Sequence, residues 1–193
     1  YAKVDIVLVN DKIDANPFDL ENVFFVKGSP LQIETLDRAC LKEARLAIVL
    51  CTNQADSSSD GIVASVITLI EHLHPEIKTV AECLDDRHAV LFRSTQCDSV
   101  VYTNQLIDNL LVQETQDPGV SSLVNELTDN GQGFTLYSAV VDSKFEMPYS
   151  EVAQKLTARS YNLISVEREG SHQLDYANLK SGKGDRVIYV GTT

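Results

Sequence analysis

Short, continuous apolar runs alternate with amphipathic stretches along the N-terminal half of the chain, and this alternation limits the folds that are open to it. The runs are rich in Val, Ile and Leu and are predicted strands, at residues 4–9, 23–26, 46–51, 77–81 and 99–102. Strands that are apolar throughout suit a parallel sheet covered on both faces. The stretches between them carry apolar residues at three-to-four spacing and are predicted helices, at residues 33–42, 61–74 and 86–95. The sequence therefore predicts an α/β fold with a doubly wound parallel sheet.

The pattern changes beyond residue 103. Two helices are predicted at residues 105–114 and 120–127, because the strong turn signal Asp117-Pro118-Gly119 separates two amphipathic stretches. Further on, the sequence predicts a small α+β lobe, with strands at residues 134–141, 163–166 and 186–190, a helix at 149–158 and a hairpin turn at 182–185. We therefore predict three parts: an N-terminal lobe (1–103), two crossover helices with a linker (104–130) and a C-terminal lobe (131–193).

Charge and hydropathy argue against two classes of partner. The net charge of −12 opposes contact with phosphate backbones, and no basic stripe reverses it locally, so no nucleic-acid partner is expected. No apolar run approaches the ~18–20 residues needed to cross a bilayer, so direct membrane insertion of this chain is not expected either.

The residues that most often carry chemistry are scattered along the chain. The four cysteines lack zinc-ligand spacing and are predicted to be small core residues in a reducing compartment: Cys40, Cys51, Cys83 and Cys97. His72 and His74 are predicted to end a helix, where a cation favours the helix dipole. No GxSxG motif surrounds any serine. We therefore predict no catalytic residue, no metal ligand and no enzyme activity.

Two groups of acidic residues are interpreted as structural. Asp85-Asp86 resembles an acid/base pair, but it directly precedes a predicted helix, where carboxylates stabilise the free N–H groups. Asp56 and Asp60 flank three serines and are interpreted as a solvated loop and helix start.

The ends of three predicted strands are the best candidates for a ligand cleft, because open α/β sheets bind ligands at this edge. No GxGxxG motif is present. Yet the first apolar run ends at Asn10-Asp11, where the second strand of a dinucleotide-binding fold places the acid that binds a ribose, so the chain begins one βα unit late. Asp11 either contacts a nucleotide or caps a turn. Thr52 and Asn53, after the third run, are either ligand contacts or ordinary turn residues.

Several segments are similar to those of one known family. Val26-Lys27-Gly28-Ser29-Pro30, followed by residues 36–39 and 44–49, resembles a strand, a glycine turn, a helix and the next strand. Residues 80–82 and 97–101 resemble a later strand–helix–strand passage, and residues 166–170 and 184–188 resemble a small C-terminal lobe. In this order they resemble the RCK domains, regulators of conductance of potassium, and their relatives in Trk- and Ktr-type potassium uptake systems. The family's first strand and glycine motif are absent, and Ser29 stands where the glycine turn normally continues with Asp.

The resemblance implies a Rossmann-like N-terminal lobe with an incomplete first unit, a crossover helix pair and a small C-terminal lobe. It implies that the chain is a cytoplasmic gating domain, tethered to the membrane through a potassium-channel pore, that assembles into a dimer or larger ring and couples ligand binding to pore opening. The ligand would be NAD, an adenine nucleotide or a divalent cation. Its predicted cleft is formed by Asn10, Asp11, Gly28, Ser29, Thr52 and Asn53.

Two other functions are carried as alternatives. The first is a separate regulatory subunit of a Trk/Ktr-type potassium transporter, which shares the lobes but has no covalent pore. The second is a fragment of a nucleotide-dependent oxidoreductase, which the missing glycine motif and the missing acid/base constellation disfavour.

The predicted helix at residues 61–74 has almost no polar face, so it needs cover on two sides. We predict that a neighbouring subunit supplies the second cover, because monomers seldom leave large apolar patches exposed. The alternative is that the crossover helices fold back over it. The predicted assembly residues are Ile62, Val63, Val66, Ile67, Ile70, Val90, Leu91 and Phe92.

Overall fold

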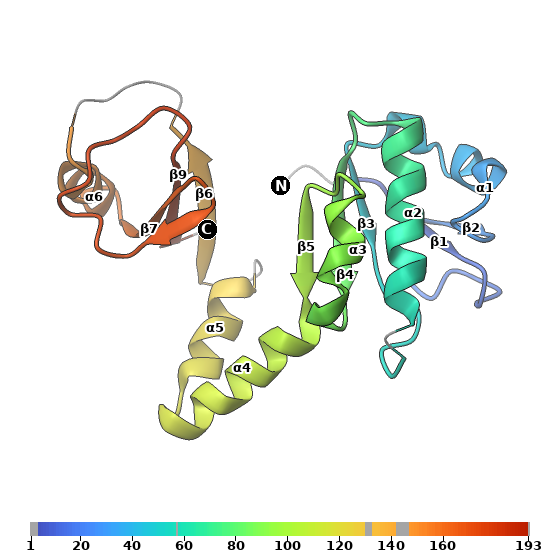
Figure 1. Ribbon diagram of the computed structural model, residues 1–193, viewed down its shortest axis with the longest axis horizontal. Coiled ribbons are helices and arrows are strands. Elements are labelled where there is room, and N and C mark those ends of the chain that lie inside the picture. Colours follow the sequence, from blue (N-terminus) through green and yellow to red (C-terminus); the bar gives the residue numbers. More distant parts are fainter. Residues whose placement is uncertain (1–3, 57, 130–132, 142–146, 193) are drawn as a thin grey trace. The chain divides into compact units, whose positions relative to one another are not determined.

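The computed structural model contains two compact units, Tyr1–Asn109 and Leu110–Thr193 (Figure 1). The described residues are 4–56, 58–129, 133–141 and 147–192. The boundary between the units falls inside a single helix, α4 (Thr103–Gln116). The three parts predicted from the sequence stay a prediction, and residues 130–132 of the predicted linker lie outside the described residues.

Strands and helices alternate along the N-terminal unit, as the apolar pattern predicts. Its elements are β1 (Ile6–Asn10), β2 (Val23–Lys27), α1 (Ile33–Arg38), η1 (Leu41–Glu43), β3 (Leu46–Val49), α2 (Ser59–Leu73), β4 (Lys78–Cys83), η2 (Asp86–His88), α3 (Ala89–Arg93) and β5 (Ser99–Tyr102). All of its paired strands are parallel, so the predicted α/β class is confirmed.

The first helix is shorter than predicted. α1 ends at Arg38 because Cys40 adopts a left-handed backbone conformation with φ 55°, and a single 3₁₀ turn follows. Cys40 is exposed, so the prediction that it is a core residue is wrong, whereas Cys83 is buried and Cys51 and Cys97 are half-buried.

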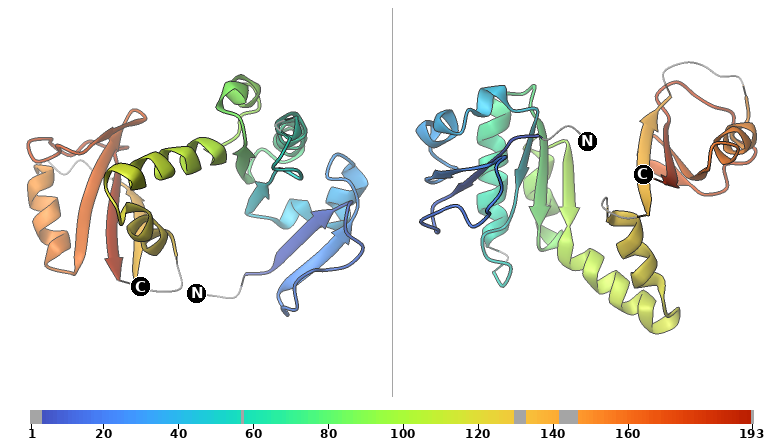
Figure 2. Two further views of the ribbon diagram at one scale, coloured as in Figure 1. Left: turned by 90° about the horizontal axis from the view of Figure 1, so that it is seen from below. Right: turned by 180° about the vertical axis from the view of Figure 1, so that it is seen from behind.

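The parallel strands form two sheets and not one. β1 pairs with β2, and β4 lies between β3 and β5. In the described part of the chain no strand pairs with the second edge of β1 or of β3. Figures 1 and 2 show that, of the two strands in the two-stranded sheet, β1 is the one nearer to β3.

The core of this unit lies between α2 and the three-stranded sheet. Val63 and Ile67 of α2 pack against Ala81 and Cys83 of β4 and against Phe92 of α3. Because the buried residues of α2 recur at helical spacing, one face of this helix covers the sheet.

The C-terminal unit is built on an antiparallel sheet. Its elements after α4 are α5 (Val120–Thr128), β6 (Phe134–Val140), α6 (Tyr149–Thr157), β7 (Tyr161–Arg168), β8 (Ser171–Gln173) and β9 (Arg186–Thr192). The strand order is β6-β9-β7-β8, and α6 lies against this sheet (Figure 2). Tyr149 at the start of α6 packs against Leu163, Val166 and Val187. The short β8 is not predicted from the sequence because it is polar, exposed and only three residues long. None of the described helices is long and apolar enough to cross a membrane.

Candidate ligand-binding site

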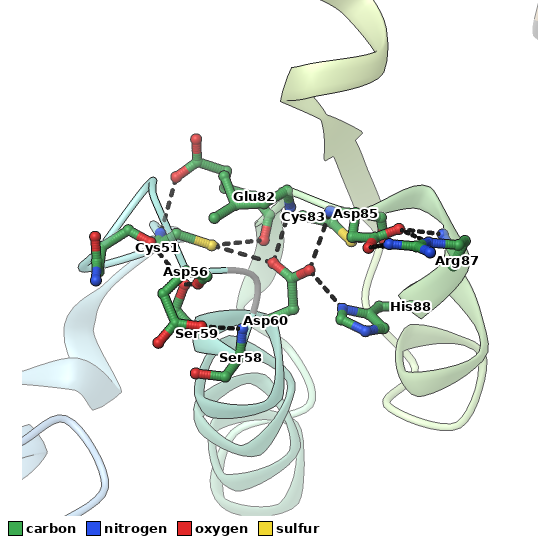
Figure 3. A network of polar contacts seen from close by, with 12 residues as sticks. Cys51, Asp56, Ser58, Ser59, Asp60, Glu82, Cys83, Asp85, Arg87 and His88 are labelled. Carbon is green, nitrogen blue, oxygen red and sulfur yellow. Dashed lines mark hydrogen bonds and ion pairs between the residues drawn. The ribbon is translucent and has the colours of Figure 1, made fainter.

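A buried carboxylate lies at the carboxyl edge of the three-stranded sheet. Asp60 belongs to the first turn of α2 and is fully buried. Its Oδ1 accepts a hydrogen bond from Leu84 N at 2.8 Å, and its Oδ2 accepts one from Asp85 N at 3.1 Å. Nδ1 of His88 lies 2.8 Å from Oδ2 and donates to it (Figure 3). Asp60 therefore joins the start of α2 to the turn that follows β4.

The same contacts keep Asp60 ionised. Burial alone would raise the pKa of Asp60, but the hydrogen bonds from Leu84, His88 and Asp85 outweigh it, so the pKa lies below the ordinary value. The position in the first turn of a helix also favours a negative charge. Asp60 lies at a helix start, as interpreted from the sequence, but it is buried and not solvated. Asp56 is exposed, and its Oδ1 accepts from Ser58 N at 2.9 Å, so it caps the loop before α2.

The two cysteines beside Asp60 are not activated thiols. Cys51 Sγ donates to Asp60 Oδ1 at 3.3 Å, and Cys51 N donates to Glu82 Oε2 at 2.8 Å. Burial and the neighbouring carboxylates raise the pKa of Cys51 to about 12, and burial with the charge of Asp60 does the same for Cys83. Because the thiolate is the reactive form, neither residue is suited to nucleophilic chemistry.

The turn after β4 is closed by an acid and an arginine. Asp85 Oδ1 accepts from the backbone N of Arg87 at 3.0 Å and from its Nε at 2.8 Å. The guanidinium holds the pKa of Asp85 at about 2. Asp85 is thus the cap of η2, as predicted. The guanidinium of Arg87 donates its hydrogen bonds to this same carboxylate.

An open cleft of about 540 Å³ lies beside this network. Its walls come from the residues that follow β3, β4 and β5, which meet at the edge where open α/β sheets bind ligands. The lining carries three carboxylates, one guanidinium and four side-chain amides. The lining residues are Gln54, Ala55, Leu84, Asp85, Asp86, Arg87, Asn104, Gln105, Asp108 and Asn109.

Most of this lining was missed by sequence reasoning. The predicted cleft considered the ends of the first three strands only. Asp86 follows the end of β4 in the same way that Thr52 follows the end of β3, and this positional signal was present in the sequence. Asp108 lies within α4, the helix that follows β5, and has no such signal.

The structure places the six predicted cleft residues in two groups. At the ends of β1 and β2, Gly28 N donates to Asn10 O at 3.1 Å, and Asp11 and Ser29 are the next residues along the chain. A Cβ at Gly28 would lie 2.5 Å from Thr35 Oγ1, so the glycine is required by packing on α1.

Thr52 and Asn53 form the second group. They follow β3, directly before the Gln54 and Ala55 that line the cleft, and both are exposed. Since β1 and β3 belong to different sheets, the structure does not join the two groups into one site.

The predicted assembly surface is smaller than expected. Five of its eight residues are buried inside the chain: Val63, Val66, Ile67, Ile70 and Phe92. They cannot meet a partner without unfolding the core. Ile62, Val90 and Leu91 are exposed and remain available.

Within the described ranges, no three His, Cys, Asp or Glu residues are grouped so that they could hold a metal ion. The cleft offers carboxylate and amide oxygens that face an open space, and its net charge is negative. It can therefore attract a cation or a ligand rich in hydrogen-bond donors, whereas it repels phosphate groups.

The sequence matches one family and two potassium-channel proteins. The TrkA-N domain family matches residues 4–103. "Putative potassium channel protein YugO" of Bacillus subtilis is 27% identical over 113 residues, which is 58% of this chain and 34% of the relative. "Calcium-gated potassium channel TvoK" of Thermoplasma volcanium is 21% identical over 193 aligned residues, which is 96% of this chain and 54% of that channel.

The human SLO3 gating ring is similar in structure, with a TM-score of 0.72 at 15% identity, covering 98% of this chain and 40% of that chain. This likeness shows a shared fold. The chain spans about a third to about half of the length of these relatives. The resemblance to RCK domains and their Trk-type relatives is confirmed, and with more than half of its residues matched the chain belongs to the TrkA-N domain family.

Proposed function

We propose that the chain is a ligand-sensing, ring-forming regulatory domain on the cytoplasmic side of a potassium channel. The observation that carries this proposal is the alignment with the channel TvoK, which extends over 96% of the chain and so includes both units. A regulator that shared only a nucleotide-binding fold with channels would align over the N-terminal unit alone.

The ligand cleft that we favour is the one lined by Asp85, Asp86, Asp108 and the amides around them. A phosphate of NAD or of an adenine nucleotide would meet three carboxylates and an arginine already paired with Asp85, so we favour a divalent cation. Because these carboxylates are not grouped so that they could hold a metal ion directly, the cation would bind in hydrated form, through its water molecules. Hard cations prefer oxygen ligands, and water molecules and amide oxygens can complete their coordination.

Gating requires that the ligand bind one arrangement of the ring more tightly than the other. Coupling free energies of this kind are typically 1–3 kcal/mol. Residues from three successive strand ends line the cleft, so a ligand there would fix the first turn of α4 relative to the turn after β4.

The ring would use the exposed residues Ile62, Val90 and Leu91 as part of a contact between copies. α2 and α3 pack against each other in the N-terminal unit, so these three side chains lie on adjoining helices. Exposed apolar residues on neighbouring elements are typical of a protein–protein contact.

The test is potassium flux through the purified full-length protein in liposomes, with Ca²⁺, Mg²⁺, NAD or ATP added on the side of this domain. We expect a divalent cation to change the flux severalfold, and Asp86→Asn with Asp108→Asn to abolish the change, while the exposed control Asp37→Asn leaves it intact. Flux that needs a second, separate membrane protein would favour the transporter-subunit alternative. Sustained NADH oxidation would favour the oxidoreductase alternative.

A further inference from the structure

β6 forms one edge of the antiparallel sheet in the C-terminal unit (Figure 1). On one side it pairs with β9 along all seven of its residues, from Phe134 opposite Thr192 to Val140 opposite Arg186. No strand in the described part of the chain pairs with its other side, which we call the open edge of β6. An exposed edge presents N–H and C=O groups that can pair with another chain, so proteins normally protect it.

The ladder between β6 and β9 shows which backbone groups face the open edge. Val141 N donates to Asp185 O at 2.8 Å, and this bond continues the register of the β6–β9 pairs by one residue. In an antiparallel ladder every second residue directs both of its backbone groups to the same neighbouring strand. The odd-numbered residues of β6 therefore bond to β9. The even-numbered residues direct their N–H and C=O groups to the open edge, and they are Phe134, Leu136, Ser138 and Val140.

β6 lacks the features that usually protect an edge strand. Its sequence, FTLYSAV, contains no proline and no charged residue. The opposite edge of the same sheet is β8, which is polar and only three residues long. Short polar strands are a common way to blunt an edge, whereas long uncharged strands invite pairing. Of the two edges of this sheet, β6 is therefore the one suited to pairing.

The side chains along the open edge are apolar and exposed. Phe134, Leu136 and Val140 are 51%, 40% and 49% exposed. Because side chains alternate along a strand, these three share one face of the sheet, opposite to the face that carries the buried Thr135. The exposed backbone groups and the exposed apolar side chains thus belong to the same residues of β6.

We infer that β6 pairs with β6 of a second copy of this chain, antiparallel, about a two-fold axis at Tyr137. In this register Phe134 lies opposite the partner's Val140, and Leu136 lies opposite the partner's Ser138. The pairs join the residues whose backbone groups point to the open edge, so each of those groups gains a hydrogen-bond partner. Contacts of this kind are self-complementary and close at two copies.

The distribution of charge favours a second copy at this edge. The chain has a net charge of −12, so two copies repel each other over much of their surface. β6 is uncharged, and the pair of Phe134 with the partner's Val140 brings two apolar side chains together. The inference concerns the C-terminal unit alone. It does not rest on the proposed ligand or on the contact proposed for Ile62, Val90 and Leu91.

Amide hydrogen exchange, resolved by residue with NMR, tests the pairing in the Leu91→Asp variant, in which the contact proposed through α3 is weakened. The amides of Leu136 and Ser138 should slow at least tenfold as the concentration rises from micromolar to millimolar and light scattering reports association. The amide of Ala139, which bonds to β9, should be slow throughout. Fast exchange of Leu136 and Ser138 in the associated protein, or a monomer at all concentrations, would overturn the inference. Slow exchange in the monomer would also overturn it, because the chain itself would then cover the edge.

A proline at the open edge gives the second test. Ser138→Pro removes an N–H that points away from β9, and edge strands tolerate proline at such positions. In the Leu91→Asp background it should weaken association at least tenfold, whereas Ser138→Thr, which keeps the N–H, should not. Circular dichroism checks that the sheet is retained. Ser138→Lys, which places a charge at the same exposed position, should act in the same direction where the proline variant does not fold. Association as strong as in Ser138→Thr would contradict the inference.

Discussion

Each of the two units contains a carboxylate that is almost completely buried, Asp60 in the first and Asp185 in the second, and the two are stabilised in different ways. Asp185 in the C-terminal unit is 3% exposed and accepts from Arg168 Nε at 2.8 Å, Tyr149 Oη at 2.7 Å and Gly182 N at 2.7 Å. Asp60 in the N-terminal unit accepts from two backbone N–H groups, a thiol and a histidine.

The difference lies in the compensating charge. Asp185 has a guanidinium partner that stays charged at every accessible pH, so its ion pair is a permanent part of the C-terminal core. Asp60 has no permanent cation among its described partners, and it holds a turn that forms one wall of the candidate ligand cleft. We infer that the Asp185 cluster serves stability, whereas the Asp60 network positions the cleft.

The largest effect is expected from Asp185→Ala. Removing Asp185 leaves the Tyr149 hydroxyl and Gly182 N without their acceptor, and each buried donor without an acceptor typically costs about 1–3 kcal/mol. The Arg168 side chain is 37% exposed, so water can solvate its charge and the lost ion pair adds less. Urea unfolding followed by circular dichroism should show this loss. Asp175→Ala, an exposed carboxylate in the same unit, is the control and should change the free energy of unfolding by less than about 0.5 kcal/mol. A similarly small change for Asp185→Ala would contradict the inference that Asp185 serves the stability of the C-terminal unit.

Asp60→Asn should have the next largest effect. The amide keeps one acceptor for Leu84 N, but its NH₂ group would face Asp85 N, a second donor. A buried donor left without an acceptor costs about 1–3 kcal/mol. The variant should also lose ligand binding at the cleft by calorimetry while its far-ultraviolet spectrum stays native. The exposed control Asp37→Asn should do neither, and unchanged binding in Asp60→Asn would refute the positioning role.

The free energy of unfolding should fall as the pH is lowered into the acid range, and it should also fall as the pH is raised into the alkaline range. The hydrogen bond from Arg168 lowers the pKa of Asp185, and the contacts described above lower that of Asp60. Because unfolded Asp titrates near 3.9, their stabilisation is present above that pH and is lost as the pH falls below it. Burial raises the pKa of Tyr149, so its contribution is lost as the pH rises above about 10.

The unfolding free energy measured from pH 2 to pH 11 should therefore have a plateau near neutrality. Asp185→Asn should make the acid limb shallower, since one carboxyl no longer takes up a proton on unfolding. An unchanged acid limb in this variant would show that other groups control acid unfolding.

The sequence predicted the elements well and the sites poorly, for physical reasons. Apolar periodicity reports which face of an element is covered, and it placed α2, β5 and β9 to within a few residues. It could not tell that Asp60 is buried, because an acid at a helix start has the same local pattern whether or not the turn after β4 folds over it. Apolar periodicity also gave no sign of the break between β1 and β3, since both strands have the composition of inner strands; only the missing glycine motif and the place of Asn10-Asp11 pointed to it.

The smallest effect on stability, and the sharpest on assembly, is expected from Leu91→Asp. Leu91 is 39% exposed on α3, so a carboxylate there can stay hydrated, and the free energy of unfolding should change by less than about 1 kcal/mol. If Leu91 lies in a contact between copies, the same carboxylate would be desolvated without a partner, and the contact should weaken by tenfold or more.

Light scattering over micromolar concentrations should show a dimer or larger ring for the unmodified chain and a shift toward monomer for Leu91→Asp and Ile62→Asp. Phe18→Asp, at a comparably exposed position outside these helices, should assemble as the unmodified chain does. A monodisperse monomer for the unmodified chain would remove the assembly surface from the proposal.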